Sequence, residues 1–267
     1  MSDNPVVHGI ILSSMPIGEY DRRVSILTKE WGRISAFARG AQRPKSALVA
    51  ATQPFVTGAF TVIEGRSSYT MVRAEVRDYF TELRGDLTAT CHGFYFCEMA
   101  EYATAENVDE TRTLSLLYAA LRALAKKEMP ASLIRAVYEI KLLYAGGEGP
   151  QVNECVRCGN TEGPFVFHVS SGGCLCKKCA GECFDEAGRK AYELRTQSVV
   201  RGYFDLSQSA WYTLRYIAAT PPGKLFSFLV KDEVLAELRT LSDAWYAEYS
   251  GRTYKSAAML AEVEQME

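Results

Sequence analysis

Two Cys-x-x-Cys pairs, Cys155/Cys158 and Cys176/Cys179, constrain the fold of this chain more than any other feature of its sequence. Each pair wraps a turn that brings two thiolates together, and the paired spacing is typical of a tetrahedral four-cysteine zinc site. Four sulfurs fill the coordination sphere of the ion, so no position remains for a reactive water molecule. We therefore expect one structural Zn²⁺ ion per chain, which folds a module at about residues 150–183.

Other interpretations of these cysteines remain open. Four thiolates also suit an iron–sulfur cluster, or they form a group of buried thiols without a metal. Cys174 offers an alternative Cys-x-Cys pairing, but Cys176 is preferred because its spacing matches the first pair. Cys183 is a second spare cysteine. A thiol-redox enzyme would need a lowered thiol pKa at Cys174 or Cys183, for which Lys177 and Lys178 offer positive charge.

Composition indicates a globular protein of the reducing cytoplasm. Of 267 residues, 48% are hydrophobic and 23% are charged, and the length favours two domains. The sequence has no basic N-terminal run before an apolar core and no apolar stretch of about 18 residues, so we expect no membrane association. Most of the eight cysteines fall between 155 and 183, which favours metal over disulfides. Cys91 and Cys97 are expected to be buried thiols.

A small β-barrel is predicted at the N-terminal end. Five β-rich runs are separated by turn signals, of which the first is Met-Pro-Ile-Gly at 15–18. A closed five-stranded sheet of this size is an OB-fold or a similar barrel, a fold that often presents one face to single-stranded nucleic acid. The predicted strands span residues 6–12, 24–28, 34–38, 55–64 and 69–76.

Alternation along two of these strands predicts which residues face outward. In the third, Ile34, Ala36 and Ala38 face the core and leave four others on the opposite surface: Arg33, Ser35, Phe37 and Arg39. In the fifth, one face would carry Thr70, Val72, Ala74 and Val76, and the other Tyr69, Met71, Arg73, Glu75 and Arg77. Cations beside aromatic rings suit a ligand made of phosphates and bases.

Charge gathers in the same region, although the net charge of the chain is only −2. From Arg22 to Lys45, seven basic residues stand against one acidic residue. Such asymmetry indicates a surface that faces an anion. We expect the basic side chains to neutralise phosphates and Phe37 or Tyr69 to stack on a base. The candidate DNA-binding residues are Lys29, Arg33, Phe37, Arg39, Arg43, Lys45, Tyr69 and Arg73.

Helical periodicity follows the barrel and predicts an α+β protein with an OB-fold domain at 1–80 and a helical domain at 81–267. The zinc module interrupts the helical domain, and Gly146, Gly147 and Gly149 end the helix before it. Expected helices span 86–104, 110–127, 130–145, 184–195, 207–219, 224–230 and 232–262.

Catalytic motifs are missing from the sequence. It contains no Ser/His/Asp spacing, no phosphate-binding glycine-rich motif and no HExxH helix. The only histidine between the two cysteine pairs, His168, is predicted to lie in a hairpin. We therefore expect no catalytic residues and no enzymatic activity.

The order of barrel, helices, paired knuckles and further helices resembles the bacterial RecO family of DNA repair and recombination mediators, over most of the chain. The matching segments are EYDRRVSILTKEWGRISAFARGAQRPKS at 19–46, QPF at 53–55, CVRCG at 155–159 and SSGGCLCKKC at 170–179. The resemblance implies a protein that binds single- and double-stranded DNA and anneals complementary strands in the RecFOR pathway. It also implies a cytoplasmic protein associated with the nucleoid, and three partners: RecR, the C-terminal tail of single-strand-binding protein and, indirectly, RecA.

The resemblance also places the tail of single-strand-binding protein in an apolar pocket near the helices between 86 and 145. Lys126, Lys127, Arg135 and Lys141 would be available to its carboxylates. The competing hypothesis is a zinc-ribbon scaffold that joins proteins and never touches DNA. The basic segment of the barrel argues against that scaffold, which has no reason to gather positive charge in one place.

Overall fold

The structure is a computed structural model that describes residues 4–66, 68–183 and 203–265. Contacts divide the chain into two units. The first comprises residues 1–138, 222–227 and 254–267, and the second comprises 139–221 and 228–253. Within the described ranges, no helix combines the length and apolar character that a membrane crossing needs.

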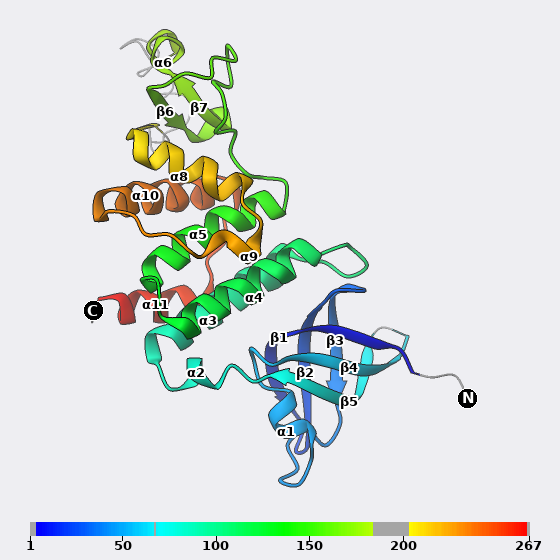
Figure 1. Cartoon of the computed structure of the whole chain (residues 1–267). Coiled ribbons are helices and arrows are strands. Elements are labelled where there is room, and N and C mark those ends of the chain that lie inside the picture. The colour runs from blue at the N-terminus through cyan, green and yellow to red at the C-terminus, as the bar shows by residue number, and fades with distance from the viewer. Residues whose placement is uncertain (1–3, 67, 184–202, 266–267) are drawn as a thin grey trace. The chain divides into compact units, whose positions relative to one another are not determined.

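The first unit begins with a closed five-stranded barrel (Figure 1). The strands follow the order β1-β2-β3-β5-β4, and β4 pairs with β1 to close the barrel. Only β3 and β5 are parallel neighbours. This arrangement confirms the predicted OB-fold barrel. The elements are β1 Val6–Ile17, β2 Asp21–Thr28, β3 Gly32–Ala38, the short helix α1 Leu48–Ala51, β4 Thr57–Glu64 and β5 Tyr69–Asp78.

Alternating side chains of β3 help to build the barrel core, as predicted. Ile34, Ala36 and Ala38 are fully buried, and the side chains between them are partly exposed. Phe60 from β4 and Met71 from β5 pack into the same core. Burial of each large apolar side chain stabilises the fold by roughly 1.5–3 kcal/mol.

A β-bulge makes the predicted alternation of β5 wrong. Thr61 of β4 pairs with Arg73, whereas its neighbour Val62 pairs with Met71, so Val72 has no partner opposite it. The extra residue reverses which side chains face inward. The buried or core-packed residues of β5 are consequently Tyr69 and Met71 before the bulge and Ala74 and Val76 after it.

The predicted turn at residues 15–18 is also wrong, because β1 continues through Pro16 to Ile17 and the turn follows at 18–20. Pro16 pairs with Arg22 of β2, while β4 contacts β1 only from Val6 to Ile10. This end of β1 is therefore an edge on one side. An edge position tolerates proline, which cannot donate a hydrogen bond to a second neighbouring strand.

Helices complete the first unit. The ring of Phe96 in α3 stacks on Tyr138 in α5 with 4.3 Å between centroids, and the Tyr138 hydroxyl donates to the Phe96 carbonyl at 2.9 Å. Glu98 of α3 accepts the backbone N–H groups of Lys255 and Ser256, and so holds the N-terminus of α11. The helices are α2 Thr81–Arg84, α3 Leu87–Ala103, α4 Thr111–Lys126, α5 Ala131–Ala145, α9 Pro222–Leu225 and α11 Lys255–Glu264, of which α5 continues into the second unit.

Asp86 caps the N-terminus of α3. Its side chain accepts the Ala89 N–H at 2.9 Å and forms an ion pair with Lys127 at 2.6 Å. These interactions, first the Ala89 hydrogen bond and then the Lys127 ammonium, lower the pKa of the Asp86 carboxyl. Because the folded pKa is lowered, the stabilising contribution is complete above the ordinary pKa of aspartate and is lost as the pH falls through the lowered value.

We predict that Asp86→Ala lowers the free energy of unfolding by about 1 kcal/mol at pH 7, because α3 loses its cap. Urea unfolding of parent and variant at pH 7 and at about pH 3 measures the effect, and the difference should shrink at the lower pH. Asp86→Asn keeps an acceptor oxygen and should lower the free energy of unfolding by less than Asp86→Ala does. A difference that is equally large at both pH values would contradict the role of the charge.

The second unit contains a three-stranded sheet of order β7-β6-β8 and two long helices. His168 ends β6 and its Nδ1 lies 2.6 Å from the Ser171 hydroxyl, in the hairpin as predicted. The predicted helix at 184–195 lies outside the described residues. The elements are β6 Phe165–His168, the 3-10 turn η1 Val169–Ser171, β7 Gly173–Cys176, α6 Lys177–Cys183, β8 Tyr203–Asp205, α8 Gln208–Ala219 and α10 Asp232–Tyr249.

Two predicted helices differ from those observed. The predicted helix at 232–262 is two helices, α10 and α11, since Gly251 takes a left-handed φ of +55° between them. The predicted helix at 224–230 is the single turn α9, which starts earlier, at Pro222. The Ser227 hydroxyl donates to the Lys224 carbonyl at 3.0 Å just beyond its end. The predicted stop of α5 is confirmed, because the helix ends before the three glycines.

Candidate metal centre and nucleic-acid interface

The first cysteine pair lies on a loop that its own backbone closes. The Gly159 N–H donates to the Cys155 carbonyl at 2.9 Å, and the Cys155 N–H donates to the Asn160 carbonyl at 2.7 Å. Gly159 has a φ of +73°, a conformation that glycine adopts without steric cost. The glycine that follows the pair therefore allows the chain to fold back, with Cys158 beside Cys155.

The second pair lies where a strand becomes a helix. Cys176 ends β7, and Cys179 lies in the first turn of α6. At the start of β7, a Cβ on Gly173 would lie only 2.1 Å from the Gln151 carbonyl oxygen, so this close approach requires glycine. The Cys174 N–H donates to that same carbonyl at 2.8 Å. β7 is thereby fixed against the segment that leads into the first pair.

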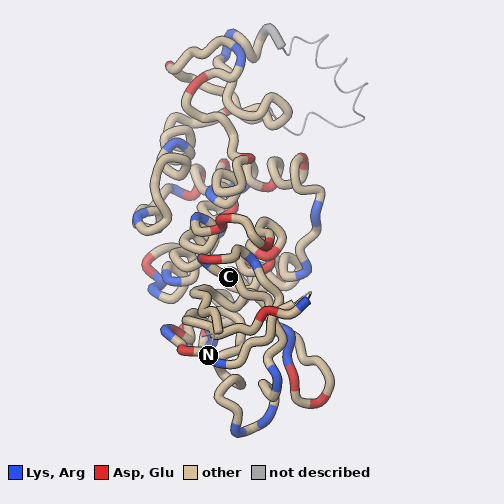
Figure 2. Tube along the Cα trace, turned by 90° about the vertical axis from the view of Figure 1, so that its right-hand side faces the viewer, with Lys and Arg blue, Asp and Glu red and all other residues tan. Residues whose placement is uncertain are grey.

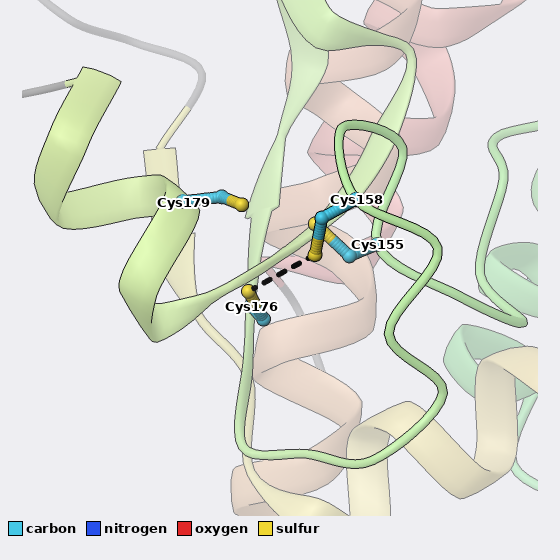
Figure 3. A group of neighbouring side chains, drawn as sticks. All are labelled: Cys155, Cys158, Cys176 and Cys179. Carbon is cyan, nitrogen blue, oxygen red and sulfur yellow. Dashed lines mark hydrogen bonds between the residues drawn. The ribbon is translucent and has the colours of Figure 1, made fainter.

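The two pairs converge on one point (Figure 3). The sulfur atoms of Cys155, Cys158, Cys176 and Cys179 all lie within 4.8 Å of one another, and those of Cys158 and Cys176 are 3.7 Å apart. In a tetrahedral site with Zn–S bonds of about 2.3 Å, neighbouring sulfurs are about 3.8 Å apart. The four thiols therefore fit a tetrahedral metal ion.

The pKa values of the clustered thiols differ widely in the absence of a cation. Burial raises the pKa of the Cys155 thiol, but hydrogen bonds from backbone N–H groups, foremost that of Cys176, outweigh burial and lower the pKa to about 6. Burial and hydrogen bonds with the other three thiols raise the pKa of Cys179 to about 12. One thiol ionises readily while its neighbour keeps a proton. Four thiolates at this separation need the positive charge of a metal ion.

The spare cysteines stand apart from this group. Cys174 is fully buried and is not one of the four converging thiols. Burial, with the nearby Cys155 sulfur, raises its pKa to about 12, which is the reverse of what a reactive redox thiol needs. The side chain of Cys183 lies outside the described residues. In α3, Cys91 and Cys97 are buried as predicted.

The barrel divides the candidate DNA-binding residues between its two ends. Lys29 directly follows β2 and Arg33 lies near the start of β3, where its Nε donates to the Thr104 carbonyl at 3.1 Å. A second group lies beyond the other end of β3, on the loop that leads to α1 (Figure 1), and is exposed to solvent. In Figure 2 this loop is the lowest part of the chain and carries Lys and Arg residues, drawn in blue. This group, called the basic loop, comprises Arg39, Arg43 and Lys45.

Tyr69 does not lie on an accessible face. It is 9% exposed, and its ring stacks on Trp31 with centroids 5.3 Å apart. Its hydroxyl donates to Glu106 at 2.7 Å, and this hydrogen bond, with burial, raises its pKa to about 12. Little of the ring is left for a base to stack on. Arg73 is exposed and forms an ion pair with Glu75 at 2.9 Å.

Phe37 lies in a row of residues that only the strand register reveals. On the outer surface it is flanked by Arg23 of β2 and Thr70 of β5, and Met15 of β1 pairs with Arg23. Met15 is 64% exposed, and the Arg23 Nε donates to the Ser35 hydroxyl at 2.8 Å. The sequence marked Arg23 as basic but gave no signal that it neighbours Phe37. The four residues, called the outer row, place a cation between apolar side chains.

Comparison with known families matches both parts of the chain. The model of the recombination protein O N-terminal domain matches residues 1–80, and the model of the recombination protein O C-terminal domain matches residues 84–258. The first match covers the barrel and the second includes the cysteine module.

Individual relatives agree over nearly the whole length. DNA repair protein RecO of Acetivibrio thermocellus is 32% identical over 247 residues, which cover 92% of each chain. The proteins of the same name from Listeria monocytogenes serotype 4a and Bacillus subtilis are 31% and 30% identical, over 97% of this chain and 94% of theirs. The barrel, the converging cysteines and these matches together show that the chain belongs to the RecO family of DNA repair proteins.

Proposed function

We propose that this chain is a non-catalytic mediator of DNA repair and homologous recombination. In this proposal it binds single- and double-stranded DNA, anneals complementary strands, and helps RecA to load on strands coated by single-strand-binding protein. Membership of the RecO family supports the role in DNA repair. The alternative is a zinc-ribbon scaffold without DNA binding.

One observation carries the DNA-binding part: cations and apolar side chains share one outer surface of an OB-fold barrel. The outer row sets Arg23 beside Phe37, and the basic loop begins two residues after Phe37. Cations bind phosphates regardless of sequence, and aromatic rings stack on any base. Retention of single- and double-stranded oligonucleotides at low salt tests this part, and the scaffold alternative predicts none.

We propose Zn²⁺ as the ion of the four-cysteine site, with a structural role. Four sulfurs at tetrahedral spacing suit zinc, and they leave no open position for a substrate. Cys155, Cys158, Cys176 and Cys179 would hold the ion, which would supply the counter-charge for four thiolates. Exposed Lys177 and Lys178, between the ligands of the second pair, offset the excess negative charge of such a centre.

RecR and the tail of single-strand-binding protein are proposed as partners on the basis of the family. Several cations predicted for the tail are already engaged. Lys127 pairs with Asp86 at 2.6 Å, and Arg135 binds Glu264 at 2.9 Å. Lys141 donates to two backbone carbonyls of α8, at 2.9 and 2.8 Å. Lys126 is exposed.

A better site for the tail is a cavity of about 670 Å³ in the first unit, lined by β1, β4, β5 and α4. Leu114 and Tyr118 of α4 supply an apolar wall suited to an aromatic side chain. Lys29 and Arg77 also line the cavity, and both are exposed and outside any ion pair in the described part of the chain. Their charges complement an acidic peptide.

We predict that Lys29→Glu/Arg77→Glu weakens binding of the tail peptide by about tenfold or more, because repulsion replaces attraction at the cavity. Fluorescence anisotropy with a labelled tail peptide measures the change. Arg66→Glu, on the turn between β4 and β5, alters an exposed cation outside the cavity lining and serves as the control. Unchanged peptide affinity in the double variant would place the tail elsewhere.

A further inference from the structure

Three hydrogen bonds join the β1–β2 turn and the start of β2 to the start of the basic loop. The Gln42 N–H donates to the Tyr20 carbonyl and the Gln42 side-chain amide to the Asp21 carbonyl, both at 2.8 Å. The Gly40 N–H donates to the Asp21 carboxylate at 2.7 Å. Two segments that are distant in sequence are thereby held together at one end of the barrel.

This junction carries an exposed aromatic ring. The Tyr20 side chain is 44% exposed, and the guanidinium carbon of Arg43 lies 5.0 Å from the centre of its ring. Tyrosine at the surface offers a large planar area at a small cost in conformational entropy. The hydrogen bonds of Gln42 fix the backbone on which the ring stands, so little further ordering is needed when a ligand stacks there.

The surroundings of the ring suit a nucleic-acid strand. Arg39 and Lys45 are exposed on the same loop as Arg43, so cations for phosphates accompany the ring. In OB-folds, the loop between the first two strands and the face of strands two and three are where oligonucleotides bind. Tyr20 lies on that loop, and Phe37 lies on that face.

We propose that Tyr20, backed by Arg43, is a base-stacking platform that makes this barrel prefer single-stranded over duplex DNA. The inference rests on the proposed DNA binding and adds the chemical group that is recognised, the exposed face of an unpaired base. In a duplex each base is covered by its neighbours, so a ring on a loop finds no free face. In a single strand it does, and aromatic stacking is tolerant of sequence.

The competing explanation is structural: Tyr20 only packs under Arg43 to hold the loop. The two explanations differ in their dependence on bases. A platform loses affinity when either the ring or the bases are removed, and removal of the ring costs nothing further on a strand that has no bases. A merely structural tyrosine affects single strands, duplexes and strands without bases alike.

The test measures the affinity of the full chain for three probes by fluorescence anisotropy: an oligothymidine, a duplex of equal length and an abasic strand of equal length. Tyr20→Ala should weaken oligothymidine binding by roughly 5- to 150-fold and duplex binding by less than about twofold. Tyr20→Phe should retain affinity, and Tyr20→Leu should behave like the alanine variant while keeping apolar bulk. Tyr79→Ala, which removes another exposed tyrosine of this unit, is the matched control.

The parent should also bind the abasic strand more weakly than oligothymidine, and Tyr20→Ala should distinguish the two strands less than the parent does. Equal losses on all three probes, or no loss on oligothymidine, would overturn the platform while leaving DNA binding intact. Failure of the parent to bind any of the three probes would instead overturn the proposed function, and the platform with it.

Discussion

Cys155→Ser is expected to abolish stoichiometric zinc and to unfold the cysteine module, because a closed tetrahedral site needs all four of its ligands. The parent should contain one zinc ion per chain by elemental analysis, since four thiolates close a single tetrahedron. Zinc binding to such sites is worth about 10–16 kcal/mol in peptides, and much of that energy is folding energy. Cys179→Ser should behave in the same way.

Thermal unfolding and limited proteolysis of the second unit measure the loss of folded structure in these variants. Cys174→Ala is the matched control, because this buried cysteine is close in sequence but outside the converging thiols. It should keep its zinc and lose only packing. Folded parent protein without zinc, or a Cys155→Ser variant that melts like the parent, would show that the site does not hold the module together.

Replacing the basic loop with alanine is expected to have the second largest effect. Each phosphate contact displaces counterions, so Arg39→Ala/Arg43→Ala/Lys45→Ala should flatten the plot of log affinity against log salt on single strands. The change is about 0.7 per lost contact, or about 2 if all three side chains contact phosphate. At about 0.1 M salt this corresponds to roughly 100-fold weaker binding, similar for all sequences.

Titrations of one oligonucleotide at several salt concentrations measure this slope. A control variant of equal charge change replaces three exposed cations of the helical part of the first unit, Arg84, Arg112 and Lys255. It should leave the slope nearly unchanged. If the loop variant keeps the affinity and slope of the parent, the DNA-binding surface does not include the basic loop.

The parts of this protein that the sequence predicted are those encoded by local spacing. The Cys-x-x-Cys pairs bring their own turns, and Gly159 follows the first pair where its left-handed conformation is needed. Strand β3 alternates without interruption, so its buried side was readable. The end of α5 was readable as well, because several glycines follow it closely.

Features that depend on strand register could not be read in this way. The bulge at Val72 changes which side chains of β5 face inward, yet nothing in the local sequence marks it. Tyr69 was a plausible stacking residue until Trp31 and Glu106, both distant in sequence, proved to contact it. An exposed tyrosine ring lies instead on the β1–β2 turn, at Tyr20, and the sequence gives no sign that Arg43 packs against it.

The prediction of one helix boundary was wrong for a different reason. The apolar periodicity continues past residue 250 and predicts one long helix. The positive φ of Gly251 instead separates two helices at this point. A glycine at such a position costs a helix about 1 kcal/mol relative to alanine. That penalty was a usable signal for the break between α10 and α11.

Strand annealing tests the proposed role in DNA repair most directly. Two complementary fluorescent strands, each first coated with single-strand-binding protein, are mixed with the zinc-containing parent or with the basic-loop variant. We predict that the parent accelerates annealing of both bare and coated strands and that the variant loses most of this acceleration. Annealing no faster with the folded, zinc-containing parent than without protein would contradict the proposed function and favour a scaffold that joins proteins without acting on DNA.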